Sequence, residues 1–442
     1  MSVVEAGQSL VVDPLRWPDL VRVPPAGIKA RMARRFFARI VARLPLRVVG
    51  PSGRRLGGGG GPDSPVMQLL RPAEFFARLG TDGLIGFGEA YQCGAWDTED
   101  LAGVLRVFAQ RLIELAPHRI PRKIRSLYNA RVPTAEDADL PGAVRNVERH
   151  YDLSNDLFEL FLDESMTYSS ALFGPQLAAT GYPDPEPDAD PEHPDELRGV
   201  ALRDAQMRKV DSILDAAGVH EGSRVLEIGS GWGALAMRAA GQRGATVTTL
   251  TLSREQKALA EARIAAAGLS DRIEVRFADY REAGPPADGL CYDAVVSVEM
   301  IEAVGEKYLP DYFQSIDRLL APGGRAAIQA ITMAHQRMLA VRTSYTWLQK
   351  YIFPGGLILS VQAMEQAARA RTRLRLVRRL DFGEDYAQTL RTWRERFDAR
   401  WPAARALGFD DVFRRTWRYY LASCEAAFGT GYLGVSQLTF AR

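Results

Sequence analysis

Hydrophobic residues in the second half of the chain form short runs that alternate with amphipathic segments. Short apolar runs are typical of strands buried on both faces, and amphipathic segments are typical of helices that cover a sheet. The predicted strands are residues 224–228, 245–252, 272–279, 292–298 and 325–332, and the predicted helices are residues 233–242, 254–267 and 308–320. This alternation predicts an α/β fold with a parallel, doubly wound sheet. Residues 434–442 are predicted to form a terminal strand that pairs with the sheet edge.

The first part of the chain follows a different pattern. Residues 28–44 carry apolar side chains at helical spacing with five arginines among them, which predicts a basic amphipathic helix. A run of glycines, Gly57–Gly61, predicts a hairpin tip or a mobile loop. Two further helices are predicted near residues 72–79 and 98–116, and residues 132–142 are polar and proline-punctuated, as an interdomain linker would be.

A chain of 442 residues predicts two domains. We place the first at residues 1–135 and the second at residues 145–442, with a Pro- and Asp-rich loop at residues 174–200. The net charge of only +2 argues against a nucleic-acid partner bound by global charge. The three cysteines are scattered, without metal-ligand spacing, which favours a reduced compartment. Since we find neither a signal peptide nor a membrane-spanning run, a cytoplasmic protein without a metal site is expected.

The strongest local motif follows the first predicted strand, in Val225-Leu-Glu-Ile-Gly-Ser-Gly-Trp-Gly233. Glycines allow positive φ and a close approach of the backbone to a ligand. Their GxGxG spacing differs from the GxGxxG dinucleotide fingerprint, and a carboxylate, Glu227, precedes them. A carboxylate at this place suits the ammonium group of S-adenosylmethionine. The motif therefore predicts a site for that cofactor, with binding residues Glu227, Gly229, Ser230, Gly231 and Gly233.

The ends of the next two strands extend the predicted site, because ligands of open α/β sheets bind at the carboxyl ends of the strands. The second strand ends near Thr251 and Leu252, and Gln256 follows on the next helix. The third ends at Ala278-Asp279-Tyr280, where Asp279 is expected to contact adenine. The alternative for Asp279 is a turn or a helix cap.

Six motifs, in this order along the chain, resemble those of the cyclopropane-fatty-acyl-phospholipid synthases, a family that includes the mycolic acid cyclopropane synthases. They are His150–Phe158, Met166–Phe173, the glycine turn, Glu299–Gly305, Tyr351–Gly355 and Asp381–Tyr386. The likeness begins near residue 66 and includes a segment, Phe75–Trp96, that is similar to the N-terminal domain of phospholipid-acting members. It implies a class I S-adenosylmethionine-dependent methyltransferase fold with a smaller α+β N-terminal domain.

The resemblance also implies a reaction. Methyl transfer to the double bond of an unsaturated acyl chain leaves a carbocation, from which a base removes a proton. Family members hold a bicarbonate ion at that place through Glu, His and Tyr side chains and the backbone near a Cys. Glu302 and Tyr386 match the family's Glu and Tyr, and Tyr168 and Ser169 match cofactor-contacting residues. An aromatic ring suits a sulfonium cation through cation–π attraction.

Two positions depart from the family pattern. The Cys is Ser170 here, and the His is Gln329, which cannot exchange a proton near neutral pH. His335 lies six residues further on, and we do not expect it to substitute. The departures leave bicarbonate in doubt and two products open. A 1,2-hydride shift before deprotonation gives an exomethylene chain, which a partner reductase could convert into a methyl branch, whereas direct ring closure gives a cyclopropane.

A phospholipid substrate requires access to a bilayer. The helix at residues 28–44 has the composition of an interfacial helix, so we expect peripheral association with the inner face of the membrane. Its alternative is a helix docked on its own domain with a solvated basic face. Residues 333–362 are expected to cover the acyl site as a lid, or to be plain core packing. A homodimer is a further partner hypothesis.

Two other functions remain open. The first is methylation of a soluble small molecule with the same cofactor, against which the N-terminal domain argues. The second is a lipid-binding relative without catalysis, against which the glycine turn, Glu302 and Tyr386 argue. Cofactor binding without consumption of methyl groups would distinguish the second from an enzyme.

Overall fold

The computed structural model describes residues 10–115, 142, 154–174, 194–286 and 289–442. The chain forms two compact units. Unit 1 contains Met1–Val132, Thr343–Ile352 and Asp398–Tyr432, and unit 2 contains Pro133–Arg342, Phe353–Phe397 and Leu433–Arg442. The contacts thus divide the chain differently from the two continuous domains expected, because later segments return to the N-terminal elements.

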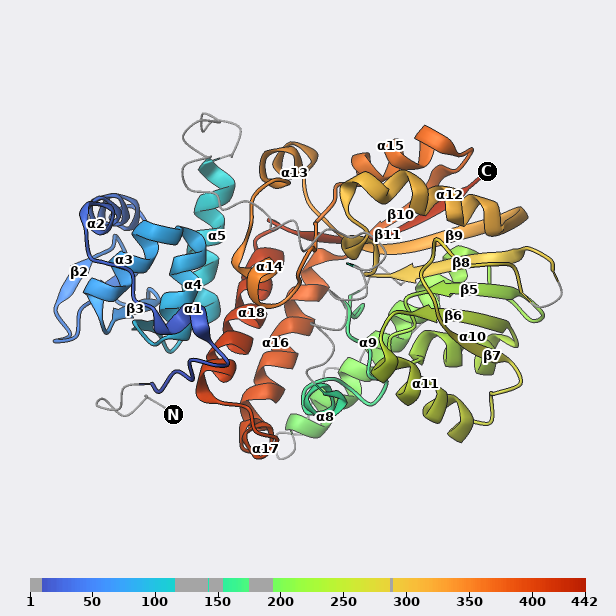
Figure 1. The fold of residues 1–442 in the computed structure, drawn as a ribbon, viewed down its shortest axis with the longest axis horizontal. Helices are drawn as coiled ribbons and strands as arrows, with labels where there is room; N and C mark the ends of the chain where they lie inside the picture. Colours follow the sequence, from blue (N-terminus) through green and yellow to red (C-terminus); the bar gives the residue numbers. More distant parts are fainter. Residues whose placement is uncertain (1–9, 116–141, 143–153, 175–193, 287–288) are drawn as a thin grey trace. The chain divides into compact units, whose positions relative to one another are not determined.

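Unit 2 is built on a seven-stranded sheet with the order β10-β11-β9-β8-β5-β6-β7 (Figure 1). The strands are β5 Arg224–Ile228, β6 Thr246–Thr251, β7 Ile273–Phe277, β8 Tyr292–Val298, β9 Leu320–Thr332, β10 Arg375–Asp381 and β11 Gly434–Ala441. Strands β7, β6, β5, β8 and β9 are parallel neighbours, whereas β11 is antiparallel to both β9 and β10. The five strands predicted from apolar runs are confirmed, although β9 begins five residues earlier than predicted.

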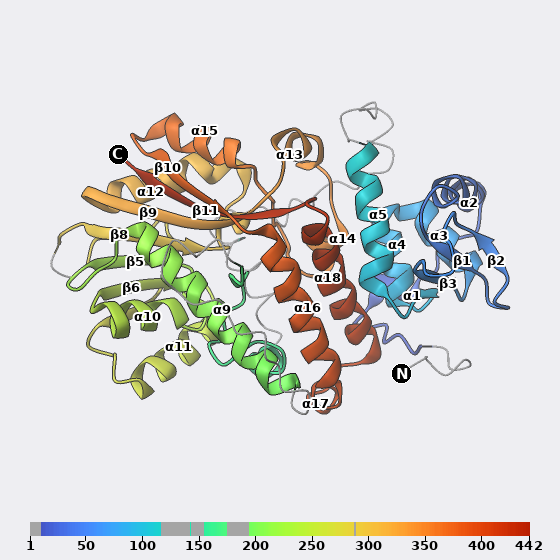
Figure 2. The ribbon, with the colours of Figure 1, turned by 180° about the vertical axis from the view of Figure 1, so that it is seen from behind.

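Helices cover both faces of this sheet, as Figures 1 and 2 show. Helices α9 Pro194–Ala217, α10 Ala234–Arg243 and α11 Arg254–Ala266 share one apolar core, and α12 Leu309–Leu319 and α15 Val361–Arg371 share the other. Neighbouring residues of β5 face opposite sides, since Val225 belongs to the first core and Leu226 to the second. The predicted doubly wound class is confirmed.

The predicted terminal strand is confirmed as β11 and pairs with the edge strand β10, but it lies inside the sheet because it also pairs with β9. β11 is inserted between β9 and β10, and β10 forms the edge. Strand β10 was not predicted from the sequence, because most of its residues, Arg375–Asp381, are exposed and three of its seven are arginines. Charged side chains are a usual protection of an edge strand, whose unpaired backbone groups would otherwise template pairing with another chain.

Unit 1 has a four-stranded sheet with the order β2-β1-β3-β4. Its strands are β1 Arg47–Val49, β2 Arg55–Gly57, β3 Val66–Leu69 and β4 Trp96–Asp97. Its helices are α1 Pro18–Val21, α2 Ile28–Val41, α3 Pro72–Asp82, α4 Leu84–Gln92, α5 Leu101–Leu115, α14 Trp347–Tyr351, α17 Trp401–Ala406 and α18 Asp411–Gly429. The helices predicted near residues 28–44, 72–79 and 98–116 are confirmed as α2, α3 and α5.

Helix α18 belongs to unit 1 because its polar residues bond to the strand and helix ends there. The guanidinium of Arg415 donates to the carbonyl oxygens of Tyr91 (2.6 Å) and Trp96 (3.0 Å) and pairs with Asp97 (3.0 Å). It also lies 4.1 Å from the centre of the Tyr91 ring. A buried charge with so many partners is costly to separate from them, so this contact fixes α18 against the N-terminal segment.

The segment expected to be a lid, residues 333–362, is divided between the two units. Its middle belongs to unit 1, where Trp347 is buried and donates to Gln92 (2.8 Å), and the Tyr351 hydroxyl donates to Glu89 (2.9 Å). Its two flanks belong to unit 2. Core packing, the alternative stated for these aromatic residues, is what the structure shows for Trp347 and Tyr351.

The middle of the glycine run, Gly58–Gly60, packs closely against neighbouring residues, and the run is not the hairpin tip. A Cβ added at Gly58 would lie 1.9 Å from the Leu46 carbonyl oxygen, and the Gly60 N–H donates to that oxygen (3.2 Å). The tip of the β1–β2 hairpin is instead near Gly53 (φ 74°). Only glycine permits this close approach of two backbones.

Part of the sequence prediction falls outside the described residues. This holds for residues 132–141 of the predicted linker and for residues 175–193 of the Pro- and Asp-rich loop. The last part of that loop, from Pro194, is helical because α9 begins there. Among the described helices, none is long and apolar enough to span a bilayer.

Candidate active site

The turn after β5 has the backbone conformation that its glycines predict. Gly229, Gly231 and Gly233 have φ values of 99°, 48° and 88°. The N–H groups of Gly229 (3.0 Å) and Ser230 (2.8 Å) donate to the Leu250 carbonyl oxygen, which ties the turn to β6. Positive φ is rare for other residues, so glycine is needed to turn the strand into α10.

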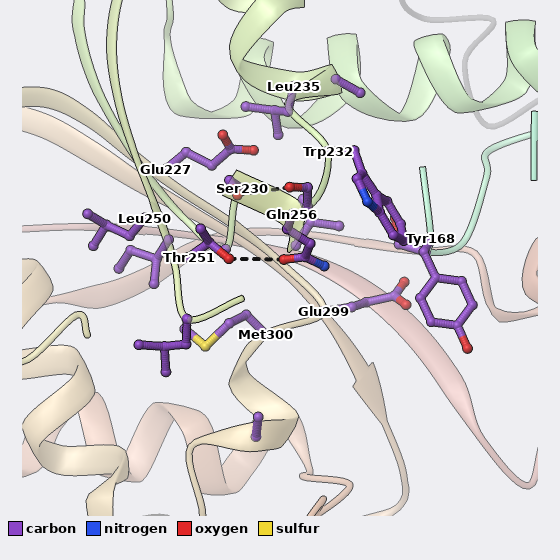
Figure 3. A pocket seen from close by; sticks show the side chains of 18 of the residues that line it. Tyr168, Glu227, Ser230, Trp232, Leu235, Leu250, Thr251, Gln256, Glu299 and Met300 are labelled. Carbon is purple, nitrogen blue, oxygen red and sulfur yellow. Dashed lines mark hydrogen bonds between the residues drawn. The ribbon is translucent and has the colours of Figure 1, made fainter. Parts of the chain in front are cut away.

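A pocket opens at this turn, at the carboxyl ends of the parallel strands (Figure 3). Of the thirteen residues predicted to bind the cofactor, all but Gly233 line it. They are Tyr168, Ser169, Glu227, Gly229, Ser230, Gly231, Thr251, Leu252, Gln256, Ala278, Asp279 and Tyr280. Gly233 instead begins α10 and packs near Ala260.

Two polar groups at the strand ends are held by local hydrogen bonds. The Thr251 hydroxyl donates to the Gln256 side-chain oxygen (3.0 Å), as Figure 3 shows, which leaves the Gln256 amide nitrogen for other partners. Asp279 accepts from the Arg281 N–H (2.9 Å) and from its guanidinium (2.7 and 2.9 Å). Asp279 therefore stabilises its own turn, the alternative stated for it, while it also lines the pocket.

Opposite charges are buried in the pocket wall. Glu227 is 3% exposed, and burial raises its pKa to about 8, although a hydrogen bond from the Thr249 hydroxyl (2.6 Å) opposes the shift. Lys209 of α9 is 1% exposed and donates to the Ser169 hydroxyl (2.5 Å). Burial lowers the pKa of Lys209 to about 8, against the attraction of Glu299, Asp163 and Glu227. Because both pKa values are about 8, the charge of a bound ligand can change the protonation state of Glu227 and of Lys209.

Aromatic rings form one side of the pocket. The Tyr168 ring contacts Phe158 (5.1 Å between ring centres) and Trp393 (5.3 Å), and Trp232 contacts Phe158 (5.0 Å). Figure 3 shows Tyr168 and Trp232 on the same side, with Leu250 and Met300 on the other. Ring faces at this place can attract a sulfonium cation.

The four predicted catalytic residues do not line this pocket, but they surround one residue that does, Glu299. One oxygen of Glu299, Oε1, accepts from the Ser170 N–H (2.9 Å) and from the Gln329 amide (2.9 Å). The Tyr386 hydroxyl also bonds to the Glu299 side chain. Burial raises the pKa of Glu299, while Lys209 and these donors act in the opposite direction.

Glu302 lies beside this cluster with a different set of contacts. Its Oε1 accepts from the Ile331 N–H (2.5 Å), and its Oε2 is buried without a hydrogen-bond partner among the described residues. Burial and then the neighbouring Glu299 carboxylate raise the pKa of Glu302 to about 8. Two carboxyl groups so close do not both ionise readily, so Glu302 is mainly the neutral acid at pH 7.

Gln329 is fixed by a second glutamine. Its side-chain oxygen accepts from the Gln437 amide (3.1 Å), and Gln437 also bonds to the Ser212 hydroxyl (2.8 Å) and the Lys209 carbonyl (3.1 Å). The Gln329 amide must therefore present its N–H groups to Glu299. His335 is not part of this cluster, because its ring bonds to the Ser360 hydroxyl (2.8 Å).

The sequence reasoning assigned no role to Glu299, Lys209 or Gln437. A signal existed for Glu299, because it directly follows β8 at the carboxyl edge, as Asp279 follows β7 with one residue between. It is also one of three described non-glycine residues with positive φ (49°), which no sequence pattern discloses. No comparable signal exists for Lys209 and Gln437, whose side chains reach the cluster from α9 and β11.

The doubly wound sheet, the glycine turn and the pocket at the strand ends together define a class I S-adenosylmethionine-dependent methyltransferase. The cofactor fits the residues present, since the positive-φ glycines keep the backbone free of side chains and buried acidic groups face the pocket.

Comparisons with known proteins identify the family. The model of the mycolic acid cyclopropane synthetase family matches residues 139–438, and the chain belongs to this family. A Mycobacterium tuberculosis protein named tuberculostearic acid methyltransferase UfaA1 is 46% identical over 99% of both chains. The Escherichia coli cyclopropane-fatty-acyl-phospholipid synthase is 31% identical over 86% of this chain and 88% of its own.

A solved structure supports the same assignment. Mycolic acid cyclopropane synthase CmaA1, complexed with SAH and CTAB, is 28% identical and superposes with a TM-score of 0.57 over 68% of this chain and 98% of its own. The protein is therefore an enzyme, and S-adenosylmethionine is its methyl donor.

Proposed function

We propose that this enzyme methylates the double bond of unsaturated fatty acyl chains in membrane phospholipid, and that its product is a methylene-branched chain, the precursor of a methyl branch. The observation that carries the proposal is the extent of the likeness. The family model begins at residue 139, whereas the relative named for tuberculostearic acid aligns over 99% of the chain and therefore includes the N-terminal region. The E. coli relative, which also aligns beyond the family model, is named for a phospholipid substrate.

The pocket suits a reaction in which positioning matters more than activation. An alkene is a poor nucleophile, so the enzyme must hold it against the methyl donor and exclude water. S-Adenosylmethionine supplies a sulfonium methyl group that the alkene attacks. The aromatic side with Tyr168 and Trp232 and the apolar side with Leu250 and Met300 provide little hydrogen bonding to water.

The choice of product depends on what happens to the carbocation that remains on the chain. Gln329 stands where the family has a histidine, and its amide donates to Glu299, so it accepts no proton. We infer that deprotonation is delayed long enough for a 1,2-hydride shift, which gives the exomethylene chain. Reduction to a methyl branch then requires a separate reductase, because this step consumes a hydride.

The outer face of α2 supports access to a bilayer. Its inner face buries Phe37 and Val41 in unit 1, so the helix is docked on its own unit, as one alternative stated. Its outer face nevertheless exposes Ile28 (68%), Met32 (59%) and Phe36 (67%), which lie four residues apart and therefore form one stripe. Arginines flank this stripe at positions 31, 35 and 39. Apolar side chains framed by cations suit an anionic lipid surface.

The first experiment is lipid analysis after expression in a host that lacks its own synthase. Mass spectrometry should find acyl chains heavier by one CH2 unit, and NMR should find the two vinylidene protons of an exomethylene group. Cyclopropane proton signals in place of vinylidene signals would contradict the proposed product and keep the methyltransferase assignment. If the lipids are unchanged although the expressed protein is folded and binds S-adenosylmethionine, phospholipid is not the substrate.

The second experiment tests the outer face of α2. Serine substitution of Ile28, Met32 and Phe36 together should weaken binding to anionic vesicles at least tenfold, from about 1.4 kcal/mol or more of lost burial, and leave binding of S-adenosylmethionine unchanged. A matched control replaces three other exposed apolar residues, Leu290, Val377 and Leu407. Equal loss in both variants would contradict a role specific to α2.

A further inference from the structure

We infer that the chain's own carboxylate, Glu299, occupies the place at which relatives would hold a bicarbonate ion, and that Glu299 is the proton acceptor of the reaction. This rests on the proposed function, since it assigns the base for that reaction. It concerns only residues of unit 2 that the structure describes.

The first argument is that the donors for an anion are already in use. The groups at the family's Cys, His and Tyr positions are the Ser170 N–H, the Gln329 amide and the Tyr386 hydroxyl. All three bond to Glu299. A further N–H of the same region, that of Ile331, donates to Glu302 (2.5 Å). A bicarbonate ion at this place would have to displace a carboxylate from its hydrogen bonds.

The second argument is electrostatic. A bicarbonate ion among these groups would lie beside two carboxyl groups, Glu299 and Glu302. Burial, and then the charge of Glu299, already raises the pKa of Glu302 to about 8. The single nearby cation is Lys209 among the groups that act on Glu299, and it is shared with Asp163 and Glu227. Adding a second negative charge beside the buried Glu299 carboxylate is unfavourable. The residues present therefore do not fit the ion.

The third argument is that Glu299 is held in a strained conformation. Its φ of 49° lies in the left-handed region, which is unfavourable for a residue with a Cβ. Such strain persists where the surroundings fix it, and it is concentrated at functional sites. Here it directs the carboxylate to the three donors, and Glu299 also lines the pocket, whereas Gln329, Ser170 and Tyr386 do not. Figure 3 shows the Glu299 side chain at the pocket.

The chemistry balances with Glu299 as the base. The alkene π electrons form the bond to the methyl carbon while the C–S electrons go to sulfur, and the neighbouring chain carbon becomes cationic. A hydride from the methyl-bearing carbon moves to that cation, which places the positive charge beside the new methyl group. Glu299 then takes a proton from this methyl group, and the C–H electrons form the C=CH2 bond. Its raised pKa makes the carboxylate a better proton acceptor than an exposed one.

The test removes the carboxylate and supplies it again from solution. Glu299→Ala should turn over at least about 100-fold more slowly, the usual contribution of a positioned base. Because the three donors remain, added formate or bicarbonate should bind in the cavity and restore turnover in a saturable manner. Glu299→Gln, which fills the space without a charge, should not respond. Glu299→Asp should retain partial activity, because aspartate tolerates positive φ.

Binding gives a readout that does not depend on turnover. NMR titration with 13C-labelled formate or bicarbonate should show binding to Glu299→Ala and none to the wild type, and S-adenosylmethionine affinity and thermal unfolding should show that each variant is folded. Wild-type turnover should not change when bicarbonate is removed.

Three results would overturn the inference: wild-type turnover that requires bicarbonate, a Glu299→Ala variant as active as the wild type, or a folded Glu299→Ala variant that no small anion restores. A wild type that methylates lipid but requires bicarbonate refutes only the base assignment. A wild type that methylates no lipid refutes the proposed function itself.

Discussion

The pocket at the glycine turn and the polar cluster around Glu299 adjoin in unit 2, and they are built by different means. The pocket owes its shape to backbone conformation, since glycines with positive φ line it at the carboxyl ends of the parallel strands. The cluster owes its order to a chain of side-chain hydrogen bonds from Gln437 through Gln329 to Glu299.

This difference determines how each region responds to change. In a pocket shaped by the backbone, replacing a single glycine that has positive φ distorts the backbone. Such a substitution should lower the affinity for the cofactor. Removing one member of a side-chain hydrogen-bond network leaves the other members buried without partners. Such a substitution should lower turnover, because the catalytic groups are less well positioned, while the cofactor still binds. The two regions can thus be separated by measuring affinity and turnover in the same variants.

The largest effect is expected at Gly229. Its φ of 99° is unfavourable for a β-branched residue, and an added Cβ would press on Met300 (3.3 Å). Gly229→Val should therefore weaken S-adenosylmethionine binding about 100-fold, which corresponds to roughly 3 kcal/mol of strain. Isothermal titration calorimetry measures the affinity.

A second glycine with positive φ serves as the control. Gly218 follows α9 with φ 73°, and an added Cβ there meets no atom within 4 Å. Gly218→Val should lower thermal stability through the same kind of backbone strain and leave cofactor affinity unchanged. If both variants bind the cofactor equally well, the glycine turn does not shape the pocket.

The backbone-built part of the molecule could be predicted from sequence because each of its signals is local. An apolar run marks a strand, and the glycines after β5 mark the turn wherever the rest of the chain lies. Twelve of the thirteen predicted cofactor residues line the pocket for this reason. The edge strand β10 was missed since exposure on both faces removes the alternation that identifies a strand.

The cluster could be predicted only in part, because its members are distant in sequence and their hydrogen bonds follow from packing. Motif likeness assigned roles to Ser170, Gln329 and Tyr386 but none to the residue that they share, Glu299, although Glu299 begins one of the six motifs. The conformation that turns Glu299 toward them is a property of the backbone after β8, and Gln437 reaches Gln329 because β11 is inserted beside β9.

A smaller effect is expected at Gln437. Gln437→Leu removes the donor to Gln329 and leaves its buried oxygen unpaired, which costs about 1–3 kcal/mol of stability. Because Gln329 can then reorient, turnover should fall about tenfold, or 1.4 kcal/mol in the barrier, with unchanged cofactor affinity. The ratio of methylene to cyclopropane product should shift as well. Ser436→Ala on the same strand breaks a bond to Asp381 and should affect stability alone; equal turnover in both variants would contradict the network's role.

The smallest effect is expected in the pH dependence of stability at Glu302. Its pKa rises from 4.5 to about 8 on folding, so between these values the folded chain keeps a proton that the unfolded chain has lost. Stability contributed by this group therefore falls as the pH rises through that window. Glu302→Gln keeps the shape and the bond from the Ile331 N–H without this dependence. The melting temperature of the variant should exceed that of the wild type by a few degrees at pH 8, and the difference should shrink toward pH 5. A difference that is constant across this range would show that Glu302 is ionised in the folded enzyme, and would make it a competitor of Glu299 for the role of base.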